Sequence, residues 1–261
     1  MASNGNIDFF CLECYTDKSE VNTLQTEVIK IDRENMDLDA LKRAGEILKS
    51  GGLVAFPTET VYGLGGDGLH EESSRKIYEA KGRPSDNPLI VHVADMEHLE
   101  KIVKKVPKAA YKLAEAFWPG PMTMILEKND LVPYGTTGGL DTVAIRMPSD
   151  PIALELIRQG GGYIAAPSAN TSGRPSPTTA QHVYEDLQGK IPMILDGGAV
   201  TIGLESTIVD LTEEIPTILR PGFISLDMVQ AVLGEAQIDR GLIANDSNIH
   251  PKAPGMKYRH Y

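Results

Sequence analysis

Short apolar runs alternate with amphipathic segments along most of the chain. The apolar runs predict buried strands at 28–31, 53–56, 89–93, 122–126, 142–147, 163–166, 191–195, 207–211 and 217–219. Apolar residues at helical spacing predict helices at 38–50, 71–80, 96–103, 108–117, 151–159, 179–187 and 226–233. Because strands and helices are interleaved, the pattern predicts an α/β fold. Some consecutive strands have no helix between them, so we expect a mixed sheet.

Residues that favour helix ends stand at several of these boundaries. Asp37, Asp95 and either Thr178 or Thr179 precede helical segments and can accept hydrogen bonds from the first free backbone N–H groups. Gly51-Gly52 follows the first helix, where glycine is favoured. We expect three parts: an unassigned arm at 1–21, a catalytic domain at 22–233, and an extended linker at 234–261.

The charge of the chain limits its partners. The 261 residues carry a formal net charge of −11, which repels nucleic acid and anionic membranes. We therefore expect no membrane association and no tight tRNA binding by this chain alone. No apolar run is long enough for a transmembrane helix, and the first ten residues do not resemble a secretory signal. A cytoplasmic location is expected.

The two cysteines, Cys11 and Cys14, form a single C-x-x-C pair. A structural zinc site needs two further ligands, and neither a second C-x-x-C pair nor an H-x₃₋₅-H pair is present. A redox site normally follows a strand in a βαβ unit, which this region does not resemble. We favour neither a metal nor a redox role here.

A hydroxyl-rich segment, 57–64, follows a predicted buried strand, where α/β folds place ligand sites. Thr58 and Thr60 can bind a polar substrate or satisfy the local backbone, and the spacing does not decide between the two. Residues 63–68 match G-x-G-x-x-G, but the helix begins only near Glu71. We interpret these glycines as a flexible turn and not as a dinucleotide site.

Basic residues recur near predicted strand ends. Lys81 and Arg83 lie in a Gly- and Pro-containing loop suited to phosphate, and Asn87 adds amide donors. His92 lies in an apolar strand, as either a core residue or a ligand-binding one. Arg146 ends another strand, where it needs an anion: a substrate carboxylate or a protein acid.

Two further loops extend this pattern. The segment 165–176 is small and rich in hydroxyls, which favours either phosphate binding or a solvated loop. Leu204-Glu-Ser-Thr207 and Arg220-Pro-Gly222 flank the last predicted strands. The cations of the five loops are Lys81, Arg83, Arg146, Arg174 and Arg220. In a chain this acidic, their shared context predicts one cleft that binds anions.

These five segments, in this order, resemble the YrdC-like threonylcarbamoyl-AMP synthases. The most specific pieces are Lys81-x-Arg83-Pro and Ser168-x-Asn170, supported by the segment 57–64. The resemblance covers roughly 22–233, and 253–261 resembles the family's interdomain linker. It implies a twisted open mixed sheet with helices around a large concave cleft. The two-domain branch of the family continues beyond such a linker into a second domain, which this chain would lack.

The resemblance also implies an activity. The family joins L-threonine, bicarbonate and ATP into threonylcarbamoyl-AMP, with magnesium accompanying ATP, and other proteins then use the adenylate for t6A modification of tRNA. The residues implied for threonine are Thr60, His92, Arg146, Ala166 and Ser206. The residues implied for ATP are Arg83, Asn87, Thr142, Ser168, Ser176, Arg220 and Tyr261. Lys81 and Arg83 are implied as catalytic cations, and no metal ligand is implied among the side chains.

Two alternatives remain open. An RNA-binding module could place a phosphate backbone in the basic cleft, although the net charge and the lack of aromatic runs are unfavourable. A carbamoyl-transfer domain of the hydrogenase-maturation type shares this fold type. Proteins of that type are longer chains with paired C-x-x-C motifs, whereas this chain has a single C-x-x-C motif.

Overall fold

The computed structural model describes residues 24–239. The predictions for the arm 1–21, for Cys11, Cys14 and Tyr261, and for most of the linker 234–261 lie outside the described residues. The order of elements along the chain is β1 (Glu27–Lys30), α1 (Leu38–Lys49), β2 (Val54–Phe56), β3 (Gly63–Asp67), α2 (Glu71–Lys81), β4 (Ile90–His92), α3 (Met96–Ile102), α4 (Lys108–Phe117), β5 (Met122–Glu127), α5 (Tyr134–Thr137), β6 (Thr142–Arg146), α6 (Pro151–Gln159), β7 (Ile164–Ala165), α7 (Ala180–Leu187), β8 (Met193–Asp196), β9 (Thr207–Asp210), β10 (Thr217–Arg220), α8 (Leu226–Leu233) and β11 (Gln237–Ile238).

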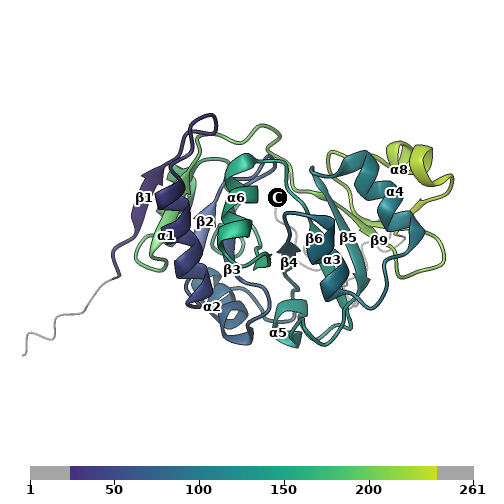
Figure 1. Cartoon of the computed structure of the whole chain (residues 1–261), viewed down its shortest axis with the longest axis horizontal. Helices are drawn as coiled ribbons and strands as arrows, with labels where there is room; N and C mark the ends of the chain where they lie inside the picture. Colours follow the sequence, from purple (N-terminus) through teal and green to yellow (C-terminus); the bar gives the residue numbers. More distant parts are fainter. Residues whose placement is uncertain (1–23, 240–261) are drawn as a thin grey trace, which may run out of the picture.

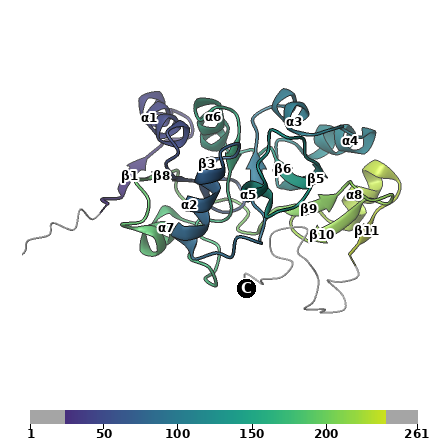
Figure 2. The same cartoon turned by 90° about the horizontal axis from the view of Figure 1, so that it is seen from below.

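The strands form one mixed sheet, as the sequence predicts. Their order is β1-β8-β2-β3-β7-β4-β6-β5-β9-β10-β11, with parallel pairs such as β4/β6 and antiparallel pairs such as β5/β6. Figure 1 shows α1, α6, α3 and α4 across one side of this sheet. Figure 2 shows α2 and α7 on the other side of the half that contains β1, β8 and β3. The helices therefore cover the two halves of the sheet differently.

Side-chain caps fix the starts of the predicted helices. The carboxylate of Asp37 accepts a hydrogen bond from the Ala40 N–H at 3.0 Å, and Asp95 accepts one from His98 at 2.9 Å. Of the two candidate threonines, Thr179 is the cap. These contacts satisfy backbone donors that have no partner within the helix.

The glycine-rich segment after β2 is a strand, so its interpretation as a flexible turn is wrong. Gly63–Asp67 forms β3, which pairs with β2 and β7 inside the sheet. A Cβ at Gly65 would lie 2.8 Å from Cγ2 of Ile164 and 2.9 Å from Cε1 of Phe56. Glycine is required here because two buried side chains pack directly against the backbone of β3.

The half of the sheet around β4, β6, β5 and β9 presents two different faces. Successive side chains in a strand point to opposite sides. Val91 and Ile145 face α3 and α4 and belong to a large apolar core. Ile90 and Ala144 point the other way, into a small cluster completed by Ile125, Ile208 and Leu219. This second face forms the floor of the pocket described below.

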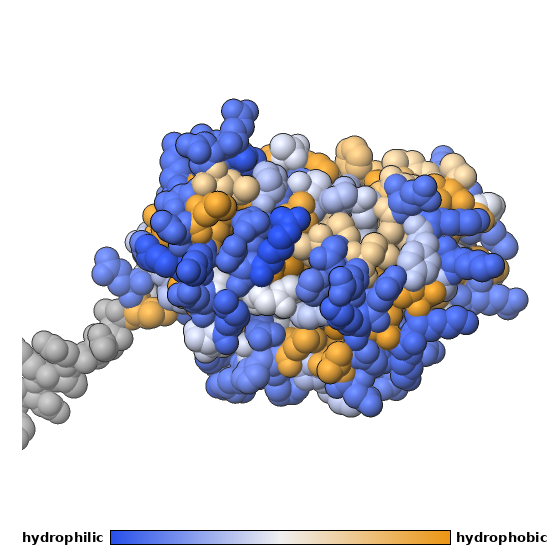
Figure 3. Space-filling view, in the orientation of Figure 1, coloured by the Kyte–Doolittle hydropathy of each residue, from blue (hydrophilic) through white to orange (hydrophobic). Residues whose placement is uncertain are grey.

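The surface is mainly polar. Figure 3 shows hydrophilic residues over most of the face that carries α1, α6 and α3, with smaller apolar areas between them. Among the described residues, no helix has the length and apolar character needed to cross a membrane.

Candidate active site

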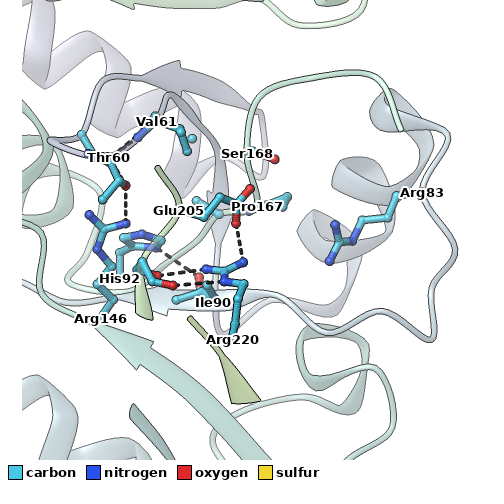
Figure 4. Close-up of a pocket in the computed structure, with 14 residues that line it drawn as sticks. Thr60, Val61, Arg83, Ile90, His92, Arg146, Pro167, Ser168, Glu205 and Arg220 are labelled. Atoms are coloured by element: carbon cyan, nitrogen blue, oxygen red, sulfur yellow. Dashed lines mark hydrogen bonds and ion pairs between the residues drawn. The ribbon is translucent and has the colours of Figure 1, made fainter. Parts of the chain in front are cut away.

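An open pocket lies on the second face of the sheet (Figure 4). Its lining residues are Thr58, Thr60, Val61, Gly63, Arg83, Ile90, His92, Arg146, Ala166, Pro167, Ser168, Glu205, Ser206 and Arg220. They come from segments far apart in the chain, and three of them are arginines.

His92 and Arg146 stand side by side on the floor of the pocket. The register of β4 and β6 pairs His92 with Arg146, and Ala166 at the end of β7 joins this edge by donating its N–H to the Ile90 carbonyl at 2.9 Å. Burial, together with the charge of Arg146, lowers the pKa of His92 to about 3. The ring is therefore neutral, and its Nδ1 lies 3.1 Å from the Ile90 carbonyl. A carbonyl only accepts, so Nδ1 donates and Nε2 is left as an acceptor.

Arg146 is held in the pocket wall by several groups of the protein. Its Nη1 donates to the Thr60 hydroxyl at 2.8 Å, and its Nε approaches the Gly120 carbonyl at 3.4 Å. Its Nη2 lies 2.7 Å from Oε1 of Glu59, but without hydrogen-bond geometry. Both side chains are buried. The protein acid considered for Arg146 is thus present and lies beside Nη2.

Arg220 is held in place by Glu205 and Ser206, two residues that are adjacent to each other in the sequence. Its Nε donates to the Ser206 carbonyl at 3.0 Å, and its Nη2 donates to the Ser206 hydroxyl at 3.0 Å. Its Nη1 forms an ion pair with Oε2 of Glu205. The other oxygen of Glu205 accepts a hydrogen bond from the Ser176 hydroxyl at 2.7 Å. Glu205 therefore joins β10 to the loop before α7.

Arg83 approaches the pocket from the loop after α2, on the opposite side of the view from Arg146 (Figure 4). Its Nε and Nη2 donate to the backbone carbonyls of Asn87 and Pro88, at 3.2 Å and 3.0 Å. Burial lowers the pKa of Arg83 to about 10, so the guanidinium remains charged at neutral pH. The loop thus presents a cation that its own carbonyl groups orient.

Lys81 lies behind the pocket and not on its surface. It is the last residue of α2 and only 1 % exposed. Its Nζ donates to the backbone carbonyls of Ser168 and Asn170, and to Oδ1 of Asn170 at 3.3 Å. The Ser168 hydroxyl donates to the same Oδ1 at 2.6 Å. The two motifs Lys81-x-Arg83 and Ser168-x-Asn170 therefore form one network that holds the loop after β7.

The structure gathers most of the predicted site residues in this pocket. Those on its surface are Thr60, Arg83, His92, Arg146, Ala166, Ser168, Ser206 and Arg220. Those outside its lining are Lys81, Asn87, Thr142, Ser176 and Arg174, so the prediction that Arg174 shares the cleft is wrong; Arg174 pairs instead with Asp186. Thr142 shares a strand face with Arg146 but stands at the other end of β6.

Glu59 and Glu205 also belong to the site, although neither was predicted from the sequence. Both stand inside motifs already singled out, each directly before a hydroxyl residue of the pocket. The signal was the presence of an acid within a segment expected to bind anions. Each is now seen to pair with an arginine of the site.

Comparison with protein families gives one match that spans most of the chain. The family model Sua5_yciO_yrdC, described as "Telomere recombination", matches residues 46–222. This range contains every lining residue of the pocket.

Individual relatives agree with this match. The chain is 53 % identical over 229 residues to the threonylcarbamoyl-AMP synthase of Pyrococcus abyssi, covering 88 % of this chain and 67 % of that protein. It is 52 % identical to the threonylcarbamoyl-AMP synthase of Bacillus subtilis, covering 85 % of this chain and 64 % of that one. The crystal structure of P. abyssi Sua5 complexed with L-threonine superposes with a TM-score of 0.87 at 52 % identity, over 90 % of this chain and 68 % of that chain. The chain thus spans about two thirds of the length of these relatives.

Proposed function

Because this chain belongs to the Sua5_yciO_yrdC family, we propose that it is a threonylcarbamoyl-AMP synthase, which converts L-threonine, bicarbonate and ATP into threonylcarbamoyl-AMP and pyrophosphate. The observation that carries the proposal is a pocket lined by three arginines in a chain whose net charge is −11. Such a pocket suits a ligand with several anionic groups.

We assign the threonine subsite to Thr60, His92, Arg146, Ala166 and Ser206. Arg146 supplies a cation in the pocket lining that suits a carboxylate, and the neutral His92 can accept a hydrogen bond at Nε2. The P. abyssi relative is described as complexed with L-threonine, which supports this substrate.

We assign the ATP subsite to the part of the pocket around Arg83, Ser168 and Arg220, with Asn87, Thr142 and Ser176 nearby. Tyr261, also expected to bind ATP, lies outside the described residues. Small residues in the loop after β7 let backbone N–H groups approach phosphate oxygens closely. Lys81 is proposed to support this subsite by holding that loop.

The reaction is an adenylyl transfer, which makes the proposed enzyme a nucleotidyltransferase. Bicarbonate gives CO₂ and hydroxide. The threonine amine loses a proton to solvent and combines with CO₂, and a second proton leaves the nitrogen to give the carbamate. A carbamate oxygen then attacks the α-phosphorus, and the bond to pyrophosphate breaks. Two anions must approach each other, so positioning and cationic groups supply the main catalytic effect. Arg146 would orient the amino acid, while Arg83 and Arg220 would face the phosphates.

Magnesium is proposed to enter with ATP. Among residues 24–239, no group of three or more His, Cys, Asp or Glu side chains is arranged to hold a metal ion. Mg²⁺ on a nucleotide needs only one or two carboxylates besides the phosphates, and the pocket contains one, Glu205, which pairs with Arg220. The donor set therefore fits a cation carried by its substrate, which would neutralise part of the phosphate charge.

The product would serve other proteins that transfer the threonylcarbamoyl group to tRNA. The acidic chain is unsuited to holding tRNA tightly by itself. If the chain were instead an RNA-binding module, it would bind tRNA without ATP and with a steep dependence on salt. If it were a carbamoyl-transfer domain, carbamoyl phosphate would replace threonine and bicarbonate.

Pyrophosphate release tests the proposal. The protein is incubated with ATP and Mg²⁺, with threonine and bicarbonate each present or omitted, and the adenylate is detected by mass. We expect release only with both cosubstrates, and we expect Arg83→Ala to abolish it while the fold is retained. Near wild-type activity in this variant would refute the role of Arg83. Pyrophosphate release that is the same with and without threonine would refute threonine as the substrate.

A further inference from the structure

Glu205 is the one carboxylate among the described residues that line the pocket. It lies between two groups that the proposed function assigns to ATP: its Oε2 pairs with Arg220, and its Oε1 accepts from Ser176 at 2.7 Å. Figure 4 shows its side chain directed at Arg220 within the pocket. A negative charge thus stands where the anionic part of the substrate is expected.

We propose that Glu205 is a specificity-determining residue that makes the pocket select a nucleotide complexed with a divalent cation over the metal-free nucleotide. This inference rests on the proposed function, because it requires that the pocket binds ATP. It assigns Glu205 a task that differs from those of the arginines, which attract phosphate whether or not a cation is present.

The physical reason is charge repulsion in a partly buried site. The side chain of Glu205 is 12 % exposed, so solvent screens it weakly. Metal-free polyphosphate would bring several negative charges beside this carboxylate and would compete with it for Arg220. A divalent cation on the phosphates removes most of that repulsion and supplies a charge that the carboxylate attracts.

The contacts of Arg220 allow this charge to be removed selectively. Both the hydroxyl and the carbonyl of Ser206 accept hydrogen bonds from Arg220, independently of Glu205. Glu205→Gln keeps the shape of the side chain and an oxygen acceptor for Ser176. Arg220 is therefore expected to stay in place when the charge of Glu205 is removed.

Calorimetric titration of ATP into the whole chain tests the proposal. Each protein is titrated once with excess Mg²⁺ and once with EDTA. The measured ratio is the dissociation constant with EDTA divided by the dissociation constant with Mg²⁺. We expect wild type to favour the Mg²⁺ form, and Glu205→Gln to lower this ratio about tenfold, equivalent to about 1.4 kcal/mol, by tightening the binding of metal-free ATP. Glu205→Ala removes the same charge by truncation and should lower the ratio in the same way.

Three controls separate this role from a structural one. Glu205→Asp keeps the charge and should keep a ratio near that of wild type. Glu97→Gln removes an exposed carboxylate that pairs with Lys101 on α3, and should leave the ratio of dissociation constants unchanged. Adenosine, which has no phosphate, should bind wild type and Glu205→Gln equally well.

The possible outcomes are distinct. An unchanged ratio in Glu205→Gln and Glu205→Ala, with ATP still bound, would overturn this inference and leave the proposed function intact. A parallel weakening of adenosine and of both forms of ATP would show a purely structural role and would also overturn it. Absence of ATP binding by wild type would overturn the proposed function and this inference together.

Discussion

Lys81 gives a direct test of how burial and hydrogen bonding balance in the site. The side chain is 1 % exposed, and its Nζ donates to the carbonyls of Ser168 and Asn170. Desolvation, with a smaller effect from Arg83, lowers the pKa of Lys81 from 10.5 to about 7. Lys81→Met keeps the length of the side chain and removes its charge. It leaves two backbone carbonyls without their donor, at a cost of about 1–3 kcal/mol each, and it also relieves the burial of an ammonium group.

The sign of the pH effect follows from linkage. Between the folded pKa of about 7 and the unfolded value of 10.5, the unfolded chain holds more of this proton than the folded protein. The free energy of unfolding therefore rises with pH in this window, by up to about 1.4 kcal/mol per pH unit, and is flat below it. From about pH 7.5 to 9.5, wild type should gain about 2–3 kcal/mol relative to Lys81→Met.

Urea unfolding of both proteins across this pH range provides the measurement. Lys112→Met, which removes an exposed lysine of α4, serves as the matched control and should follow wild type in parallel. If the free energy of unfolding of Lys81→Met changes with pH in the same way as that of wild type, the reasoning is refuted. Its three oxygen acceptors would then stabilise the charged ammonium enough to cancel the effect of burial.

Three further results are expected. Gly65→Ala should lower the free energy of unfolding by about 1–3 kcal/mol, because its Cβ would lie 2.8 Å from Cγ2 of Ile164; an unchanged urea midpoint would contradict this. His92, whose pKa is lowered to about 3, should show constant ring chemical shifts by NMR from about pH 5 to 8, and a midpoint in that range would contradict it. Arg146→Met should cost about 3–5 kcal/mol in urea unfolding because it strands buried Glu59, and the further change Glu59→Gln should restore part of that loss; no recovery would exclude an unpaired charge as the cause.

Much of the fold could be predicted because the signals for individual helices and strands lie within the segments that form them. The helix α1 has an apolar face at Leu41, Ala44 and Leu48 and a side-chain cap at Asp37, and both signals lie within the segment itself. The lack of helices between some strands correctly predicted a mixed sheet. These features depend on neighbours in sequence, so the sequence alone displays them.

The strand β3 could not be predicted in the same way. Its glycine-rich sequence has little intrinsic preference for a strand. It forms one because the backbone fits between Phe56 and Ile164, where a larger residue would collide. That requirement arises from residues on two other strands and is visible only when all three are assembled. The same applies to Lys81, whose acceptors lie 87 and 89 positions further along the chain.

Of the five cations that the sequence assigned to one cleft, Arg83, Arg146 and Arg220 line the pocket, and the partners of these three were not predicted. An arginine can pair with any acid that the fold brings near it, and this chain has 36 Asp and Glu residues. Glu59 is 87 positions from Arg146 by number, and only the fold brings the two together. Charge patterning therefore located the cleft but could not show which of its charges were already compensated.

The way in which each arginine is held decides which of them reports on ligand binding most cleanly. Arg146 and Arg220 each pair with a buried or nearly buried carboxylate, so removing either guanidinium strands a negative charge and confounds stability with function. The hydrogen bonds described for Arg83 go to the carbonyls of Asn87 and Pro88, which carry no net charge. No ion pair of Arg83 with a carboxylate occurs among the described residues. Arg83→Ala is therefore the substitution in which lost activity with retained stability can be read most directly as lost contact with the substrate.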